Sequence, residues 1–259
     1  MRVLRVQYQG KNFYAALIKD QVMCLDKTLG LDQPIALTDI IPLPTVTPTK
    51  VVCAAVNYRP HAEEIGWAIP DEPVIFFKPP TAVIGTGHSI ILPQNSARVD
   101  YEGELAVIIG KTCRYVAPQD VPSYIFGYAC ANDVTARDFQ KKDGLFGRAK
   151  GFDTFCPIGP WIETEVDDVN NLRLTTSVNG EVKQEGNTSD MIFDPFTLVS
   201  FISTVMTLNP GDAILTGTPS GIGPLTPGDE VHVEIEGVGL LSNSVVLEED
   251  ALASTTPVQ

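Results

Sequence analysis

Residues 99–110 read VDYEGELAVIIG, and from Leu105 onward this run is apolar and rich in β-branched side chains. Gly110 ends the run, so the pattern predicts a strand that enters a hydrophobic core. Glu102 and Glu104 stand just before it. Because residues two apart in a strand point to the same face, both carboxylates are expected on one side of the sheet. Gly103 between them leaves the opposite face open to close approach by backbone or ligand.

Two carboxylates on one face repel each other and cost desolvation energy unless a cation lies between them. Glu102 and Glu104 therefore indicate part of a site for a hard metal ion. The alternative is a solvated strand edge whose charges face water. Residues 124–133 read YIFGYACAND, a second apolar strand that delivers Asp133 at its end. Asp133 is either a third metal ligand or the cap of a helix expected just after it.

The ligand type narrows the choice of metal. Three carboxylates offer only oxygen atoms, which select Mg²⁺, Mn²⁺ or Ca²⁺ over zinc. Three protein ligands also leave coordination positions open for water and substrate, as catalytic metal sites do. A calcium-stabilised structural domain is a weaker alternative, because protein oxygens would then fill the coordination shell. The sequence therefore predicts a catalytic metal centre on Glu102, Glu104 and Asp133.

Composition limits the class of protein. The chain has 259 residues, of which 44% are hydrophobic and 19% charged, as in an ordinary folded protein. No apolar run approaches the roughly 20 residues that cross a bilayer, and the first residues predict a strand, not a signal peptide. Five scattered cysteines without Cys-x-x-Cys spacing indicate reduced core residues in a cytoplasmic protein. The net charge of −14 argues against nucleic acid or an anionic membrane as partner, so an anionic substrate must be attracted locally.

Short β-branched runs separated by many prolines and glycines predict a β-rich chain, and we expect an α+β fold of two units. Residues 1–48 are expected to form a small N-terminal β unit with strands over 2–8 and within 13–25. The proline-rich stretch 42–48, PLPTVTP, marks the boundary, since proline cannot join a central sheet. Residues 49–259 then form the catalytic domain.

A short helix is predicted over residues 60–65, because proline suits its first turn and Gly66 its end. His61 and Glu64 are three apart and share one helix face. A histidine paired with a carboxylate can take a proton from water; the alternative is a surface ion pair. Lys78 and Lys150 lie among loop-forming residues, with Lys150 in a loop over 148–155. Either lysine could bind a substrate carboxylate or an oxyanion, and for Lys78 the alternative is a solvated side chain.

Four blocks resemble the fumarylacetoacetate hydrolase family: DYEGEL (100–105), GYACANDVTARD (127–138), KGFDTFCP (150–157) and LTGTP (215–219). The resemblance extends in order from about Val51 to Val246. It implies mixed β-sheets rolled into a barrel-like core, a homodimer, and Mg²⁺ or Mn²⁺ on the three acidic residues. It also implies His61 and Glu64 as a water-activating dyad on a lid. Lys150 and Gln140 match the oxyanion and substrate contacts, and Thr218 matches a substrate-binding threonine. Tyr58, Arg59 and Lys78 are assigned to substrate binding beside them.

The expected activity is metal-dependent hydrolysis of the C–C bond of an acylpyruvate, such as fumarylpyruvate or acetylpyruvate, through a metal-bound pyruvate enolate. The expected partner is thus a small anionic 2-oxo acid. Two other reactions use the same site: oxaloacetate decarboxylation, and isomerisation of 2-hydroxyhepta-2,4-diene-1,7-dioate. A non-catalytic ligand-binding or scaffold protein on the same fold is a remoter alternative. The segments 67–72 and 85–97 are where family members differ, so they bear on the choice of substrate.

Overall fold

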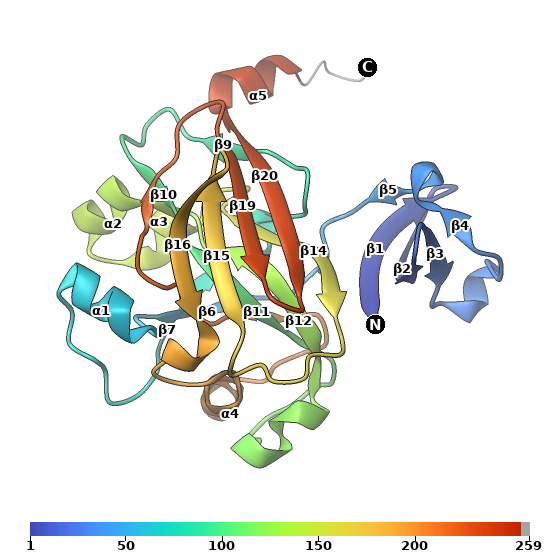
Figure 1. Cartoon of the computed structure of the whole chain (residues 1–259), viewed down its shortest axis with the longest axis horizontal. Helices are drawn as coiled ribbons and strands as arrows, with labels where there is room; N and C mark the ends of the chain where they lie inside the picture. The colour runs from blue at the N-terminus through green and yellow to red at the C-terminus, as the bar shows by residue number, and fades with distance from the viewer. Residues whose placement is uncertain (255–259) are drawn as a thin grey trace.

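The computed structural model describes residues 1–254 and arranges them as a twelve-stranded sheet, two smaller sheets and five α-helices (Figure 1). The large sheet has the order β4-β3-β2-β1-β14-β12-β11-β17-β6-β7, with β5 paired to β1 and β8 paired to β14. Its strands are β1 (Arg2–Tyr8), β2 (Lys11–Ile18), β3 (Gln21–Cys24), β4 (Ile35–Ala36), β5 (Ile41–Pro42), β6 (Val51–Ala55), β7 (Val74–Lys78), β8 (Val83–Ile84), β11 (Gly103–Ile109), β12 (Ile125–Asn132), β14 (Cys156–Glu163) and β17 (Ala213–Leu215).

The two smaller sheets are built from strands far apart in the sequence. The three-stranded sheet has the order β13-β10-β18, and the five-stranded sheet the order β16-β15-β19-β20-β9. Their strands are β9 (Ile90–Leu92), β10 (Val99–Tyr101), β13 (Thr135–Ala136), β15 (Arg173–Val178), β16 (Glu181–Asn187), β18 (Gly223–Pro224), β19 (Glu230–Ile235) and β20 (Gly239–Leu247). The helices are α1 (Arg59–Ile65), α2 (Arg137–Asp143), α3 (Phe146–Lys150), α4 (Pro195–Val205) and α5 (Glu248–Ser254).

The β-rich α+β class is confirmed, whereas the barrel-like core is not. Each strand order is open at both ends over residues 1–254, and no ring of paired strands closes there. Over the same residues, no helix is long and apolar enough to cross a membrane. The five cysteines are free, and four of them are buried, as the composition indicated.

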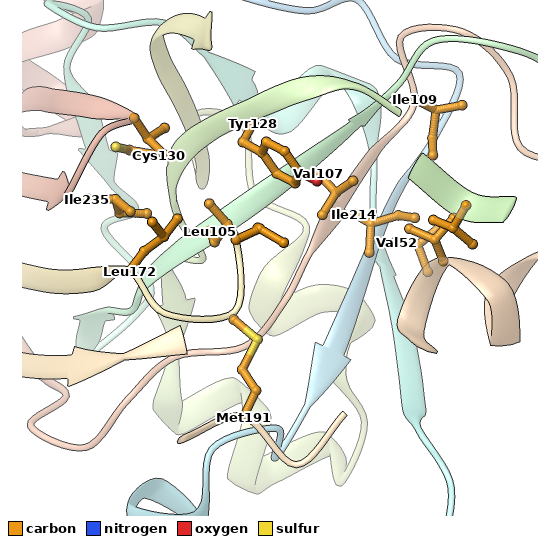
Figure 2. Close-up of a cluster of buried hydrophobic side chains, with 14 of the residues drawn as sticks. Val52, Leu105, Val107, Ile109, Tyr128, Cys130, Leu172, Met191, Ile214 and Ile235 are labelled. Atoms are coloured by element: carbon orange, nitrogen blue, oxygen red, sulfur yellow. The ribbon is translucent and has the colours of Figure 1, made fainter. Parts of the chain in front are cut away.

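Strand β11 lies at the centre of the packing, because both of its faces are buried. Leu105, Val107 and Ile109 belong to one hydrophobic cluster, which also takes in residues of β19 and α4 (Figure 2). The intervening Ala106 and Ile108 belong to a second cluster on the other face. Apolar and polar residues therefore do not alternate along β11, as expected for a strand that is covered on both faces.

Gly103, the first residue of β11, is needed for the close packing of two sheets. A Cβ atom at this position would lie 2.0 Å from Oγ1 of Thr176, a buried residue of β15. The open face predicted opposite the carboxylates is thus filled by the five-stranded sheet. Glycine permits this approach because it carries no side chain.

We expect Gly103→Ala to lower the free energy of unfolding by about 1–3 kcal/mol, the usual cost of overpacking a core. Gly147→Ala is the matched control, because an added Cβ in α3 meets nothing within 4 Å. Gly147→Ala is expected to leave the free energy of unfolding unchanged or to raise it by up to about 1 kcal/mol, since alanine has a higher helix propensity than glycine. Urea denaturation of both variants measures the difference, and equal stability of the two would contradict this account.

Local sequence signals were accurate for several elements. Strand β1 begins and ends where predicted, and the strand predicted over 124–133 is β12. Asn179 and Gly180 join β15 to β16 with φ angles of 52° and 80°, as a tight hairpin requires. The loop predicted over 148–155 is wrong in part, because Lys150 is the last residue of α3. Asp133 is not a helix cap, since α2 begins at Arg137 with Ala136 at its N-cap.

The N-terminal β unit has a small core of its own but shares a sheet with the rest of the chain. Strands β1 to β5 enclose a separate hydrophobic cluster, and Figure 1 shows them (blue) at one side of the molecule. Arg2 and Val3 of β1 pair with Glu163 and Ile162 of β14, so the large sheet continues across the predicted boundary. The division at residue 48 stays a prediction.

Candidate metal centre and active site

Strand pairing brings the three predicted acidic ligands together. Glu102 lies between β10 and β11, Glu104 is the second residue of β11, and Asp133 follows the end of β12. The two long strands are antiparallel, and the Asp133 N–H donates to the Glu102 carbonyl at 2.8 Å, which continues the ladder beyond them. All three side chains are buried, and one carboxylate oxygen from each lies within 4.8 Å of the others.

This donor set fits a hard divalent ion. Mg²⁺ takes oxygen ligands at about 2.0–2.1 Å in octahedral geometry, which sets those oxygens roughly 3–4 Å apart. A separation of up to 4.8 Å therefore needs only a small inward movement of the side chains. Glu102, Glu104 and Asp133 would hold the ion, and all three line the cavity described below.

Two buried lysines and an arginine surround Glu102 and Asp133. Lys150 donates to Glu102 Oε2 at 2.7 Å and to Asp133 Oδ2 at 2.6 Å. Lys78 donates to Asp133 Oδ1 at 2.6 Å and to the Val134 carbonyl at 3.0 Å, so the solvated alternative for Lys78 is wrong. Arg137 donates to the other oxygen of Glu102. These cations fix the orientation of Glu102 and Asp133, two of the three predicted metal ligands.

Glu102 and Glu104 differ in the positive charges that neutralise them. Burial alone would raise the pKa of Glu102, but Lys150 and Arg137 lower that pKa to about 2. Glu104 accepts a hydrogen bond from the Gly217 N–H at 2.6 Å, and within residues 1–254 no lysine or arginine forms an ion pair with it. Burial, followed by the charges of Asp133 and Glu102, raises the pKa of Glu104 well above its usual value. A divalent cation is the partner that this carboxylate lacks.

The predicted dyad forms on helix α1. His61 Nδ1 lies 2.9 Å from Glu64 Oε2, and Glu64 Oε1 accepts from the Gly221 N–H at 2.9 Å. Because an ionised carboxylate only accepts, Nδ1 of the neutral ring is the donor and Nε2 keeps the lone pair. His61 is buried at the cavity wall, which sets it apart from the surface ion pair considered as the alternative.

A cavity of about 340 Å³ is lined by both the acidic centre and His61. The predicted residues on its wall are His61, Glu102, Glu104, Asp133, Gln140, Lys150 and Thr218. Gln140 accepts from Arg137 at 3.0 Å, and Thr218 Oγ1 donates to the Gly103 carbonyl at 2.8 Å. The rest of the wall is largely apolar and includes Trp67 from the predicted variable segment.

Three residues assigned to substrate binding lie away from this wall. Tyr58 is fully buried in the main hydrophobic cluster, Arg59 is exposed at the start of α1, and Lys78 lies behind Asp133. Lys78 therefore positions Asp133, one of the predicted metal ligands. Contacts of Tyr58 and Arg59 with substrate stay predictions.

Sequence reasoning missed Arg98, Asp100 and Arg137, which also line the cavity. A signal was available for Asp100, because it precedes Glu102 by two residues and so shares its strand face. Arg137 follows Asp133 by four residues and opens α2, but nothing local indicates that it turns back to Glu102.

The fold and this site define a class of β-rich proteins with an acidic centre suited to a divalent metal and a histidine–glutamate pair. The sequence model of the fumarylacetoacetate (FAA) hydrolase C-terminal family matches residues 50–246, so the chain belongs to the fumarylacetoacetate hydrolase family. Enzymes of this family include hydrolases, isomerases and tautomerases, and this chain is an enzyme of that superfamily.

Three relatives illustrate that range. The mitochondrial oxaloacetate tautomerase Fahd2a of Rattus norvegicus is 43% identical over 215 residues, which cover 78% of this chain and 68% of the relative. The crystal structure of a 5-carboxymethyl-2-hydroxymuconate delta-isomerase from Mycobacterium smegmatis is 42% identical with a TM-score of 0.87, covering 96% and 99% of the two chains. A maleylpyruvate hydrolase from Sphingobium sp. SYK-6, solved with manganese(II) and pyruvate, is 32% identical with a TM-score of 0.81, covering 95% and 99%.

Proposed function

We propose that this enzyme hydrolyses the C–C bond between C3 and C4 of an acylpyruvate and releases pyruvate and a carboxylic acid. The observation that carries the proposal is the position of His61, which is paired with Glu64, on the same cavity as the three carboxylates. A hydrolase needs a base for water, whereas decarboxylation needs none. The maleylpyruvate hydrolase relative, an acylpyruvate hydrolase by name, supports the choice.

A divalent metal, Mg²⁺ or Mn²⁺, would supply positive charge for the carboxylate and 2-oxo group of the substrate and for the enolate that leaves. His61 Nε2 takes a proton from water while Glu64 holds the ring through Nδ1. The hydroxide forms a bond to C4, and the C3–C4 bond then breaks with its electron pair going to C3. The enolate takes a proton at C3 from His61, so atoms and charges balance.

Lys150 and Gln140 suit the stabilisation of the oxyanion at C4. Two hydrogens of the Lys150 ammonium bind Glu102 and Asp133, which leaves a third to donate. Gln140 Oε1 already accepts from Arg137, so the amide NH₂ of Gln140 is left to donate toward the cavity. Burial would lower the pKa of Lys150, but Asp133 and Glu102 raise it above its usual value, so this lysine acts as a cation and not as a base.

A second candidate is proton relocation on a 2-oxo acid, as in tautomerisation or isomerisation. The names of the rat and mycobacterial relatives support it. It requires one base that removes and returns a proton, a role that His61 Nε2 also suits. Oxaloacetate decarboxylation is a third reaction on the same site. A non-catalytic protein would have no need of the dyad, the lysine and all three carboxylates on one cavity.

A substrate panel separates these reactions. We expect the purified protein with Mg²⁺ or Mn²⁺ to cleave acetylpyruvate or fumarylpyruvate, and excess chelator to abolish the cleavage reversibly. Oxaloacetate and 2-hydroxyhepta-2,4-diene-1,7-dioate are assayed in parallel, with ultraviolet absorbance and pyruvate formation as readouts. If neither acylpyruvate is cleaved while oxaloacetate tautomerises or the dienedioate isomerises, the second candidate replaces the first.

From the family resemblance we also propose that the enzyme is a homodimer and acts in the cytoplasm. Light scattering of the purified protein tests the first point, since a mass near 28.0 kDa would indicate a monomer instead.

A further inference from the structure

Arg98, Asp100 and Arg137 form a connected charged group on the cavity wall. Asp100 is fully buried and accepts from Arg98 Nε at 2.8 Å and from Arg98 Nη2 at 3.0 Å. It also accepts from Arg137 Nε at 2.9 Å. One carboxylate thus holds two guanidinium groups, and this group carries one positive charge in excess.

The two arginines differ in what they can still bind. Each guanidinium nitrogen of Arg137 already donates a hydrogen bond, to Asp100, to Gln140 or to Glu102. Arg98 binds Asp100 through two nitrogens, and its third, Nη1, has no partner among residues 1–254. The Arg98 side chain is 54% exposed, whereas that of Arg137 is 18% exposed. Of the two arginines, Arg98 is therefore the one that is free to bind an incoming anion.

Positive charge lies at two places around the cavity. At the acidic centre, Lys150 and Arg137 bind the predicted ligands Glu102 and Asp133, and a divalent ion there would add the charge that binds the first carboxylate of a substrate. Arg98 shares Asp100 with Arg137 and keeps one guanidinium nitrogen free, so it offers a second positive group for a second carboxylate.

The spacing along the chain agrees with this. Asp100, which anchors Arg98, precedes Glu102 by two residues, about 7 Å along an extended strand. A chain of a few carbon atoms spans that distance. Ile65, Phe76 and Phe146 contribute apolar surface to the same cavity, suited to the hydrocarbon part of such a chain.

We propose, resting on the proposed function, that Arg98 binds the far carboxylate of an acylpyruvate whose acyl group itself ends in a carboxylate. Arg98 thereby selects dicarboxylate substrates over monocarboxylate ones. Asp100 holds the guanidinium in place, and Nη1 donates to the ligand together with the second hydrogen of Nη2.

The kinetic test compares fumarylpyruvate, a dicarboxylate, with acetylpyruvate, a monocarboxylate, using the full chain loaded with Mg²⁺. Arg98→Gln is expected to lower kcat/KM for fumarylpyruvate about tenfold, mainly through KM, as for loss of a partly exposed charged hydrogen bond. For acetylpyruvate the change is expected to stay within twofold. Arg98→Lys should recover part of the loss, because lysine keeps the positive charge but lacks the paired N–H donors of the guanidinium group.

A binding measurement keeps the inference testable if acylpyruvates are not substrates. The probes are 2-oxoheptanedioate and 2-oxoheptanoate, which have the same chain length and differ in the far carboxylate. Calorimetry should show the dicarboxylate binding about tenfold more tightly to the natural protein, and Arg98→Gln should remove that difference. Arg173→Gln is the control, since Arg173 is an exposed arginine paired with Glu185 outside the cavity.

Two outcomes would overturn the role of Arg98. The first is an equal loss for both substrates in Arg98→Gln, which would mean that Arg98 only positions Asp100. The second is indistinguishable binding of the two probes by the natural protein. Failure of the proposed function looks different, because neither acylpyruvate would then be cleaved while the two probes still differ in affinity.

Discussion

Glu104→Gln is expected to lower kcat/KM by about 1,000-fold, or about 4 kcal/mol of transition-state stabilisation, because the metal centre loses a charged ligand. The variant keeps the shape of the side chain and an oxygen that can accept from the Gly217 N–H. Calorimetry with Mn²⁺ should show binding at least 100-fold weaker than in the natural protein. The stabilisation that the metal gives, about 2.7 kcal/mol at 100 times Kd, should fall to about 0.4 kcal/mol or less at the same metal concentration.

In the metal-free protein, the same substitution should not lower the melting temperature. Burial and the charges of Asp133 and Glu102 raise the pKa of Glu104, so its ionised form is unfavourable in the folded state. Replacement by a neutral amide should therefore leave the metal-free melting temperature unchanged or higher. Glu163→Gln is the control, because Glu163 is also buried but binds the N-terminal amine far from the cavity. A lower metal-free melting temperature for Glu104→Gln would contradict a role confined to the metal.

His61→Ala is expected to lower the rate of acylpyruvate hydrolysis by about 10²–10⁴-fold, the usual contribution of a general base. Metal affinity should change by less than about twofold, because His61 is separate from the three carboxylates that would hold the ion. Decarboxylation of oxaloacetate should fall much less, since no water is activated in that reaction. Steady-state kinetics on both substrates, with Mn²⁺ titrations of each variant, measure these effects.

The control for this variant is His88→Ala, which removes an exposed histidine that does not line the cavity. It should leave both reactions unchanged. Equal losses of hydrolysis and decarboxylation in His61→Ala would contradict the division of roles between the dyad and the metal centre. A loss of metal binding in the same variant would place His61 among the ligands instead.

Local patterns were sufficient for the elements that carry the three acidic residues and the His61–Glu64 pair. The apolar run from Leu105 predicts β11, and the period of two places Glu102 and Glu104 on one face. Pro60 in the first turn and Gly66 just after Ile65 mark the two ends of α1, and the spacing of three residues brings His61 to Glu64. These inferences held because backbone geometry alone fixes which side chains are neighbours over a few residues.

The burial and the ion pairs of Lys78 and Lys150 could not be predicted from local patterns. Both stand among residues typical of loops, yet both are buried and bind Asp133. A lysine is buried when a carboxylate from another element pairs with it, and no local spacing encodes that pairing. Arg137 and Arg98 converge on Asp100 for the same reason.

The sequence by itself determined β1, β11, β12, the short helix α1 and the three acidic residues, because these follow from the periodicity of apolar residues and from the positions of proline and glycine. The tertiary structure decided which cations neutralise which carboxylates, that Thr176 packs against Gly103, and that Arg98 keeps a free nitrogen at the cavity wall. Electrostatic partners and close packing depend on distances between elements far apart in the chain, and only the folded arrangement fixes those distances.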